Sequence, residues 1–300
     1  MRSYLHTAPR QTAEPELGEL YDAVEVGGGE QRDRVVVRGW RQDTDEVLAA
    51  LGRAERIAQA YDRALVRVRE VLRIPQKSWW AIVYDDHPVD TLAGARFAPE
   101  AGLAAAARIA ECLAYCHDLL GTPDGDAGLP HGGVFPGALS GPITRPLLLD
   151  VALCPLRQAL AAPRDRWAAP PWLAPEQLDR HTEARTDLYG LGASIAALLL
   201  GEPLYDLSGA ADPDAWLAAR HKLDLSKPCE AIERLAPGVG DLVDRCLRVR
   251  LSERPASADQ VADALHAALA KQGRPAAMAL QARAPRPPTS FVPFSVIVEE

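Results

Sequence analysis

Hydrophobic residues recur at helical spacing in five stretches of the chain. Residues 43–61 begin with Asp-Thr-Asp, whose side chains can accept hydrogen bonds from the free amides of a first turn, and then place apolar residues on one face. Residues 99–120 are rich in alanine, which favours a helix. Residues 188–201 are apolar on every side, which is typical of a helix at a domain centre. Two further helices are expected at about residues 240–248 and 257–271.

Shorter apolar runs in the first third of the chain predict strands. Residues 34–38 and 78–84 are rich in valine and aromatic residues, which pack well on a pleated sheet. Residues 1–97 are therefore expected to form a small sheet with one helix. Residues 121–180 are rich in Pro and Gly and predict a long structured loop, a feature that is usually functional or derived from a functional one. The whole pattern predicts an α+β chain that is β-rich first and helical afterwards.

The composition is that of a soluble globular protein. The 300 residues are 48% hydrophobic and 25% charged, which excludes a mainly disordered or collagen-like chain. The longest mostly apolar run, residues 188–201, is shorter than a bilayer span, and the first residues have no apolar signal core. We therefore expect a cytoplasmic protein that does not engage a membrane. The net charge is −8 and the basic residues are spread along the chain, so nucleic acid is not expected as a partner.

The five cysteines do not form a recognisable metal motif. None of them belongs to a pair of CxxC sequences with zinc spacing. Cys112, Cys116 and His117 lie on one predicted helix and could form a metal-binding face. An alanine-rich apolar stripe surrounds them, so core packing is the favoured interpretation and no metal site is predicted.

Three strings in the second half of the chain occur in the order and spacing of a known family. They lie at residues 172–177 (WLAPEQ), at residues 186–192 (TDLYGLG), and at residues 245–255, where RCL is followed by ERP. They resemble the A-P-E segment, the start of the central helix and the late arginine motif of the eukaryotic-type protein kinases, as found in bacterial serine/threonine kinases.

The resemblance extends over about residues 12–270. It implies a bilobal kinase-like α+β fold, with a small β-rich N-lobe at residues 1–87 and a larger, mainly helical C-lobe at residues 88–271. Residues 272–300 would then be a Pro-rich flexible tail with an apolar end.

The resemblance implies architectural roles for four residues. Arg254 would form a bidentate pair with Glu176 and hold the loop around it to the helical core. Asp187, at the start of the buried helix, would accept hydrogen bonds from backbone amides of the catalytic loop. His131 keeps the first position of that loop and is also expected to be structural.

The phosphate-binding region departs from the family's pattern. Ala13 and Pro15 stand where the first two glycines of the glycine-rich loop would be, and Pro15 has no amide to offer a phosphate. Residues 35–38 resemble V-A-I-K, but Arg38 replaces the lysine and is a planar fork rather than a compact ammonium. Glu55 is the expected helix partner of Arg38, and that pair could exist without any nucleotide.

The catalytic loop departs further. The family's H-R-D-L-x-x-x-N reads HGGVFPGA at residues 131–138. Gly133 replaces the aspartate that accepts the proton of the substrate hydroxyl, and Ala138 replaces the asparagine that binds a metal ion. The D-F-G position keeps Asp150, whose carboxylate could hold a cation or cap a turn. Residues 151–176, which match the activation segment, contain no Ser, Thr or Tyr, so no phosphate can be placed there to switch it.

Together these losses predict a catalytically inactive kinase fold, a pseudokinase, that binds another protein as a scaffold or regulatory subunit. Neither ATP nor magnesium is expected as a cofactor; a nucleotide, if bound, would meet Arg38, Glu55 and Asp150. The alternative is an atypical ATP-dependent phosphoryl or nucleotidyl transferase of low activity, with Asp150 on the cation and Arg38 stabilising charge.

The end of the chain suggests where a partner could be engaged. Phe291 to Val298 is an apolar, β-prone segment on a Pro-rich tether. Such a segment suits addition to the sheet edge of a partner protein, and it can equally fold back on its own domain.

Overall fold

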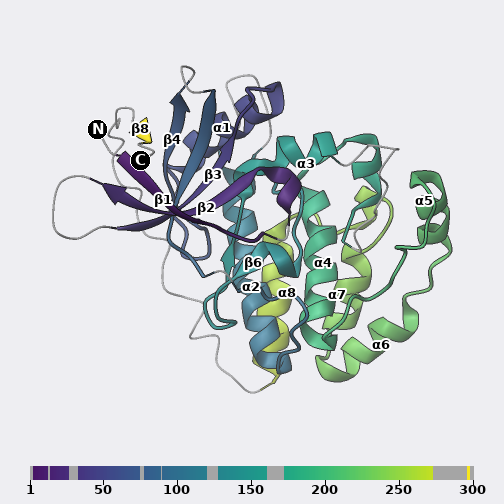
Figure 1. The fold of residues 1–300 in the computed structure, drawn as a ribbon. Coiled ribbons are helices and arrows are strands. Elements are labelled where there is room, and N and C mark those ends of the chain that lie inside the picture. The colour runs from purple at the N-terminus through teal and green to yellow at the C-terminus, as the bar shows by residue number, and fades with distance from the viewer. Residues whose placement is uncertain are drawn as a thin grey trace.

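The computed structural model describes residues 3–12, 14–26, 33–74, 78–88, 90–119, 128–160, 172–272 and 296–297. These residues form two lobes, a curled β-sheet with one helix and a larger helical lobe (Figure 1). The predicted bilobal α+β fold is confirmed. The helix and strands of the small lobe, apart from one short C-terminal strand, lie within residues 1–87, and the larger helices lie within residues 88–271.

The small lobe is built on one sheet with the strand order β4-β5-β3-β2-β1-β8. The first five strands pair antiparallel, whereas β8 runs parallel to β1. Side chains alternate between the two faces of a strand. Val36 of β3 therefore packs in the main core, while its neighbours Val35 and Val37 pack in a second core on the opposite face. The strands are β1 (Ser3–Pro9), β2 (Glu19–Val26), β3 (Arg34–Trp40), β4 (Val68–Ile74), β5 (Trp79–Asp85) and β8 (Val296–Ile297).

Helix α1 (Asp45–Ile57) packs against the sheet and the helical lobe. It begins after Thr44, whose side chain accepts a hydrogen bond from the amide of Val47 at 3.4 Å. Its buried face carries Val47, Leu51 and Ile57 of the predicted apolar stripe, whereas Leu48, which was expected on the same face, is 40% exposed.

Helix α4 (Ala184–Leu200) lies at the centre of the larger lobe, and most of its residues are buried. It ends at Gly201, whose φ of 86° lies in the left-handed region that terminates helices. Helix α2 (Pro99–Asp118) packs against both α4 and α8 (Ala258–Lys271) (Figure 1). The predicted central helix and its two long neighbours are therefore present.

Shorter elements complete the larger lobe and form the loops of the cleft. The helices are α3 (Cys154–Leu160), α5 (Pro213–Lys222), α6 (Ser226–Leu235) and α7 (Val239–Cys246), the two-residue strands are β6 (Leu139–Ser140) and β7 (Leu147–Leu148), and the 3-10 turns are η1 (Pro15–Leu17), η3 (Pro136–Ala138), η4 (Val151–Leu153), η6 (Pro175–Asp179) and η7 (Leu251–Glu253).

Most of the predicted tail, residues 272–300, lies outside the described residues; Gln272 and Val296–Ile297 are described. Val296–Ile297 form β8 beside β1. No helix in the described part of the chain combines the length and the apolarity that crossing a bilayer requires.

Candidate functional site

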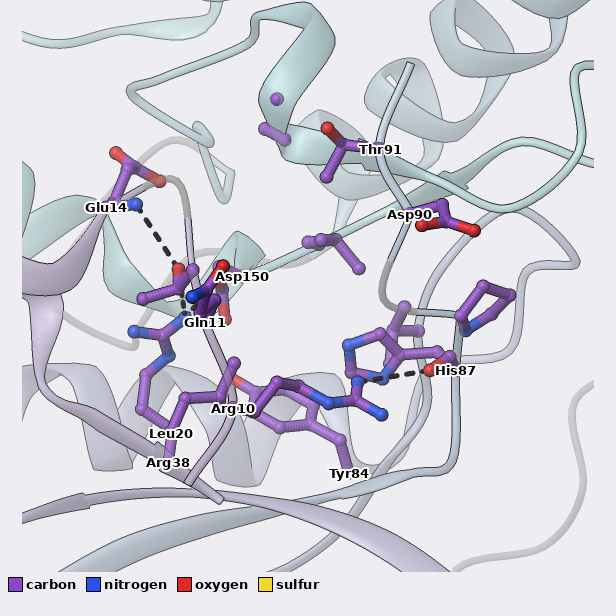
Figure 2. A pocket seen from close by; sticks show the side chains of 16 residues that line it. Arg10, Gln11, Glu14, Leu20, Arg38, Tyr84, His87, Asp90, Thr91 and Asp150 are labelled. Carbon is purple, nitrogen blue, oxygen red and sulfur yellow. Dashed lines mark hydrogen bonds and ion pairs between the residues drawn. The ribbon is translucent and has the colours of Figure 1, made fainter. Parts of the chain in front are cut away.

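A cleft of about 390 Å³ lies between the two lobes (Figure 2). The small lobe contributes Arg38 from β3 and Tyr84 from β5, and the segment that follows β5 contributes His87. The larger lobe contributes Ala138 from η3 and Asp150, which precedes η4. The structure therefore brings together three positions that the sequence singled out, Arg38, Ala138 and Asp150.

Arg38 forms an ion pair with Asp150 across the cleft (Figure 2). Its Nη2 atom lies 2.8 Å from Oδ2 of Asp150, and only 1% of the Arg38 side chain is exposed. Burial alone would raise the pKa of Asp150, but the charges of Arg38 and Arg157 lower it below its ordinary value. The Asp150 carboxylate is therefore ionised and already neutralised by a cation of the chain itself.

Glu55 is not the partner of Arg38, so this prediction was wrong. Glu55 forms an ion pair with Arg73 of β4 and is not among the residues that line the cleft. Arg53, on the other flank of α1, reaches the larger lobe instead and donates a hydrogen bond to the carbonyl of Pro130. The helix thus contacts the segment before His131 through a cation rather than through a carboxylate.

A second charged pair joins the lobes and was not predicted from the sequence. Arg157 of α3 donates from Nε and Nη2 to the two carboxylate oxygens of Glu14, at 2.9 and 2.7 Å. Its Nη1 atom donates to the carbonyls of His131 and Asp150, each at 3.0 Å. Although burial alone would lower the pKa of Arg157, Glu14 raises it above its ordinary value. A bidentate clamp therefore links the start of the degraded glycine-rich loop to the catalytic-loop region.

Arg157 also occupies the space beside Gly133. A Cβ atom built on Gly133 would lie 2.7 Å from both Cδ and Nε of Arg157. Arg157 cannot move aside freely, because Glu14 and two backbone carbonyls hold its guanidinium. The position of the family's catalytic aspartate is therefore filled by an arginine side chain that comes from another element.

Arg10 contacts the backbone of the segment that joins the lobes (Figure 2). Its Nη1 atom donates to the carbonyl of His87 at 3.1 Å, and its Nε atom donates to Asp22 at 2.9 Å. The Arg10 side chain is only 5% exposed. Burial lowers the pKa of His87, so its ring is neutral at pH 7. The backbone carbonyl of His87, in the segment that joins the lobes, is thus used by Arg10.

Asp187 holds the catalytic loop in the way that the resemblance implied. Its carboxylate accepts hydrogen bonds from the amides of His131 and Gly132, both at 2.7 Å. Nε2 of His117 lies 2.8 Å from the same carboxylate. Burial would raise the pKa of Asp187, but the contacts with His117 and His131 lower it below its ordinary value.

His131 is buried and neutral. Its Nε2 atom lies 2.6 Å from the carbonyl of Leu149, so this nitrogen carries the proton and donates it. Its Nδ1 atom accepts a hydrogen bond from the amide of Gly133 at 3.1 Å. Burial, followed by the charge of Arg157, lowers the pKa of His131 to about 3. His131 therefore links Leu149 to Gly133 as an uncharged side chain.

Arg254 and Glu176 form the expected pair in the larger lobe. Nη1 and Nη2 of Arg254 donate to the two carboxylate oxygens of Glu176, at 2.7 and 2.8 Å. Just before this pair, the ring of Trp172 stacks on that of Phe135, with centroids 4.2 Å apart and an interplanar angle of 5°. The aromatic stack, which the sequence did not indicate, ties the segment before Glu176 to the catalytic loop.

Ala138 offers no ligand to a metal ion. It is buried and is the last residue of the 3-10 turn η3. In the part of the chain that the structure describes, no three His, Cys, Asp or Glu side chains converge as a metal site. Asp150 is therefore the single carboxylate of the kinase-like metal positions, and it is paired with Arg38.

No family model and no curated protein match the chain. Solved structures do match it. The crystal structure of the Mycobacterium tuberculosis PknI kinase domain aligns with a TM-score of 0.61 at 20% sequence identity, covering 89% of this chain and 96% of that one. A variant of the same domain aligns with a TM-score of 0.61 at 19% identity, covering 89% and 95% of the two chains. This likeness shows the fold: the chain has the bilobal fold of the protein kinases.

Proposed function

We propose that this chain is a pseudokinase, a kinase fold that does not transfer phosphoryl groups and acts by binding another protein as a scaffold or regulatory subunit. The observation that carries the proposal is the position of Arg157. It fills the space beside Gly133 in which a proton-accepting carboxylate would stand, and Glu14 fixes it there. The cationic side chain of Arg157 therefore occupies the space in which the missing proton acceptor would stand.

The residues present do not fit ATP with magnesium. Arg10 uses the carbonyl of His87, and Arg38 neutralises Asp150. Pro15 has no amide with which to contact a phosphate. A magnesium ion at Asp150 would compete with Arg38 for a carboxylate that the guanidinium already neutralises. No catalytic step is therefore assigned to this cleft.

The segment before Glu176 supports the same proposal. In an active kinase a phosphate and a cluster of arginines order the activation segment. Here residues 151–176 lack a phosphate acceptor, and the stack of Trp172 on Phe135 holds the end of the segment instead. The described end of the segment is thus anchored by aromatic packing rather than by a phosphate.

The test is phosphoryl transfer from γ-labelled ATP, in magnesium and in manganese, to the chain itself and to a basic model protein. We expect no more transfer than with Asp150→Asn, which keeps the side-chain shape and loses the charge. Transfer by the native chain that disappears in Asp150→Asn would overturn the proposal and favour the atypical transferase.

A further inference from the structure

Three buried guanidinium groups lie in or beside the cleft, and each is paired with a carboxylate of the chain itself. The pairs are Arg10 with Asp22, Arg38 with Asp150, and Arg157 with Glu14. The carboxylates differ in what holds their backbone. Asp22 belongs to strand β2, and the carbonyl of Asp150 accepts a hydrogen bond from Arg157. Glu14 lies outside the strands, directly before the short turn η1.

Residues 14–18, called the strap below, contain η1 and lead into β2. The carbonyl of Leu17 accepts a hydrogen bond from the indole of Trp40 in the small lobe at 3.0 Å. Glu14 fastens the strap to the larger lobe, where its carboxylate binds Arg157. The Glu14 side chain lines the cleft (Figure 2) and is 22% exposed, so solutes in the cleft can reach it.

The guanidinium of Arg157 has the geometry of a carboxylate receptor. Its Nε and Nη2 atoms donate side by side to the two oxygens of Glu14, at 2.9 and 2.7 Å. Its Nη1 atom is held separately by the carbonyls of His131 and Asp150, so the fork keeps its direction when Glu14 leaves. Two buried cations, Arg38 and Arg157, are then left with the single carboxylate of Asp150, and the unbalanced charge favours a new anion.

We propose that Arg157 is the recognition residue of a carboxylate-binding site at the cleft, that Glu14 occupies this site in the structure, and that a small organic acid replaces it. The cleft of about 390 Å³ has the size of a small-molecule site. The acid must be small, because the Arg157 side chain is only 5% exposed. An acid bound there releases the strap from the larger lobe. The inference goes beyond the proposed function, because it holds whether or not the chain transfers phosphoryl groups.

The first experiment removes the resident carboxylate and supplies one from solution. Glu14→Ala deletes a methylene and a carboxylate, which together have the size of acetate, so acetate is the probe. In about 100 mM sodium acetate the thermal midpoint of the variant should rise by about 3 °C relative to sodium chloride of equal ionic strength. The native chain should respond by less than about 1 °C, because Glu14 competes for Arg157.

Two matched variants decide whether acetate acts at Arg157. Glu14→Gln fills the same space with a neutral side chain, and Glu14→Ala combined with Arg157→Met lacks the fork. Neither should respond to acetate more than to chloride. No response of Glu14→Ala, or an equal response of either control, would overturn the proposal. If Glu14→Ala is unfolded in chloride, recovery of the fold in acetate supports the site and its absence rejects it.

Other ligand classes are separate outcomes of the same assay. A larger rise in phosphate than in acetate would reject a carboxylate in favour of a tetrahedral anion. A rise with a blocked glutamate-containing peptide but none with acetate would reject a small acid in favour of an acidic protein segment.

Hydrogen exchange of the native chain tests the displacement of Glu14. The amides of Leu17 and Gly18 make the hydrogen bonds of η1. Their exchange should be faster in acetate than in chloride, at about ten times the acetate concentration that half-saturates Glu14→Ala. Unchanged exchange would show that acetate only fills a cavity in the variant, and would overturn the proposal. Neither readout involves phosphoryl transfer, so failure here is distinct from failure of the proposed function.

Discussion

The side chain of Arg157 packs against Gly133 and occupies the space that any side chain at position 133 would need. A Cβ atom on Gly133 would lie 2.7 Å from Cδ of Arg157, whereas about 3.4 Å is the lower limit of an ordinary contact. Gly133 stands at the position of the kinase family's catalytic aspartate. In the structure its missing side chain leaves the space into which Arg157 fits, so the glycine and the Glu14 clamp depend on each other.

Restoring the family's aspartate should therefore harm the protein rather than activate it. We expect Gly133→Asp to destabilise the fold by about 1–3 kcal/mol through overpacking, with no gain in phosphoryl transfer. Gly133→Ala should show part of the same loss, because the clash begins at Cβ. Chemical denaturation measures both changes. If the loss is the same in the background of Arg157→Ala, the clash with Arg157 is not its cause.

The clamp between Glu14 and Arg157 should contribute measurably to stability. Glu14→Gln keeps a hydrogen-bond acceptor but leaves Arg157 buried without its counter-charge, so we expect a loss of about 1.5–3 kcal/mol. A double-mutant cycle with Arg157→Met isolates the pair. A coupling energy near zero would show that the two side chains do not support each other.

The buried pair of the larger lobe should be sensitive to the shape of the cation. Arg254→Lys keeps the charge but loses the fork that binds both oxygens of Glu176, so we expect a loss of about 2 kcal/mol or more. Glu176→Gln should cost about 3 kcal/mol, because it leaves the buried guanidinium without a charged partner. Urea unfolding measures both values, and Arg250→Lys, at an exposed position, is the matched control.

Stability should fall as the pH is lowered from about 6.5 towards 3, and His131 is one cause. Its pKa is about 3 in the folded chain against an ordinary value of 6.5, so in that window the unfolded chain binds a proton that the folded chain does not. Each such proton changes the free energy of unfolding by about 1.4 kcal/mol per pH unit. His87, whose pKa is also lowered, acts in the same direction.

The contribution of His131 can be isolated by substitution. His131→Gln should reduce the slope of unfolding free energy against pH, between about pH 5 and 6, by about one proton. Asp150 and Asp187 have lowered pKa values, so their contributions persist above the ordinary carboxyl pKa and are lost only in stronger acid. An unchanged slope in His131→Gln would show that His131 is protonated in the folded chain.

The positions that follow local rules were predictable from the sequence. Residues 188–201 are apolar all round and form most of the central helix. Asp187 and Glu176 lie in strings whose resemblance to kinase motifs implied their partners, and both make the expected contacts. These contacts depend on the helical core, which a long hydrophobic pattern specifies well.

The charged pairs of the cleft could not be predicted, because they join residues that are distant in the chain. Glu14 and Arg157 are 143 positions apart, and the resemblance assigns a partner to neither of them. For α1 the apolar stripe identified the buried face, but Arg53 and Glu55 lie on opposite flanks of that stripe. Which flank faces the cleft is decided by the packing of the helix between the lobes, and this led to the wrong partner for Arg38.

The most direct test of the account is the thermal midpoint with and without millimolar ATP, in magnesium and then in EDTA. A ligand at about 100 times its dissociation constant adds roughly 2.7 kcal/mol, which moves the midpoint of a domain of this size by several degrees. We expect an unchanged midpoint, because Arg38 neutralises Asp150, and Arg10 and Arg157 already use the carbonyls of His87 and Asp150. A magnesium-dependent rise that is lost in Asp150→Asn would contradict it.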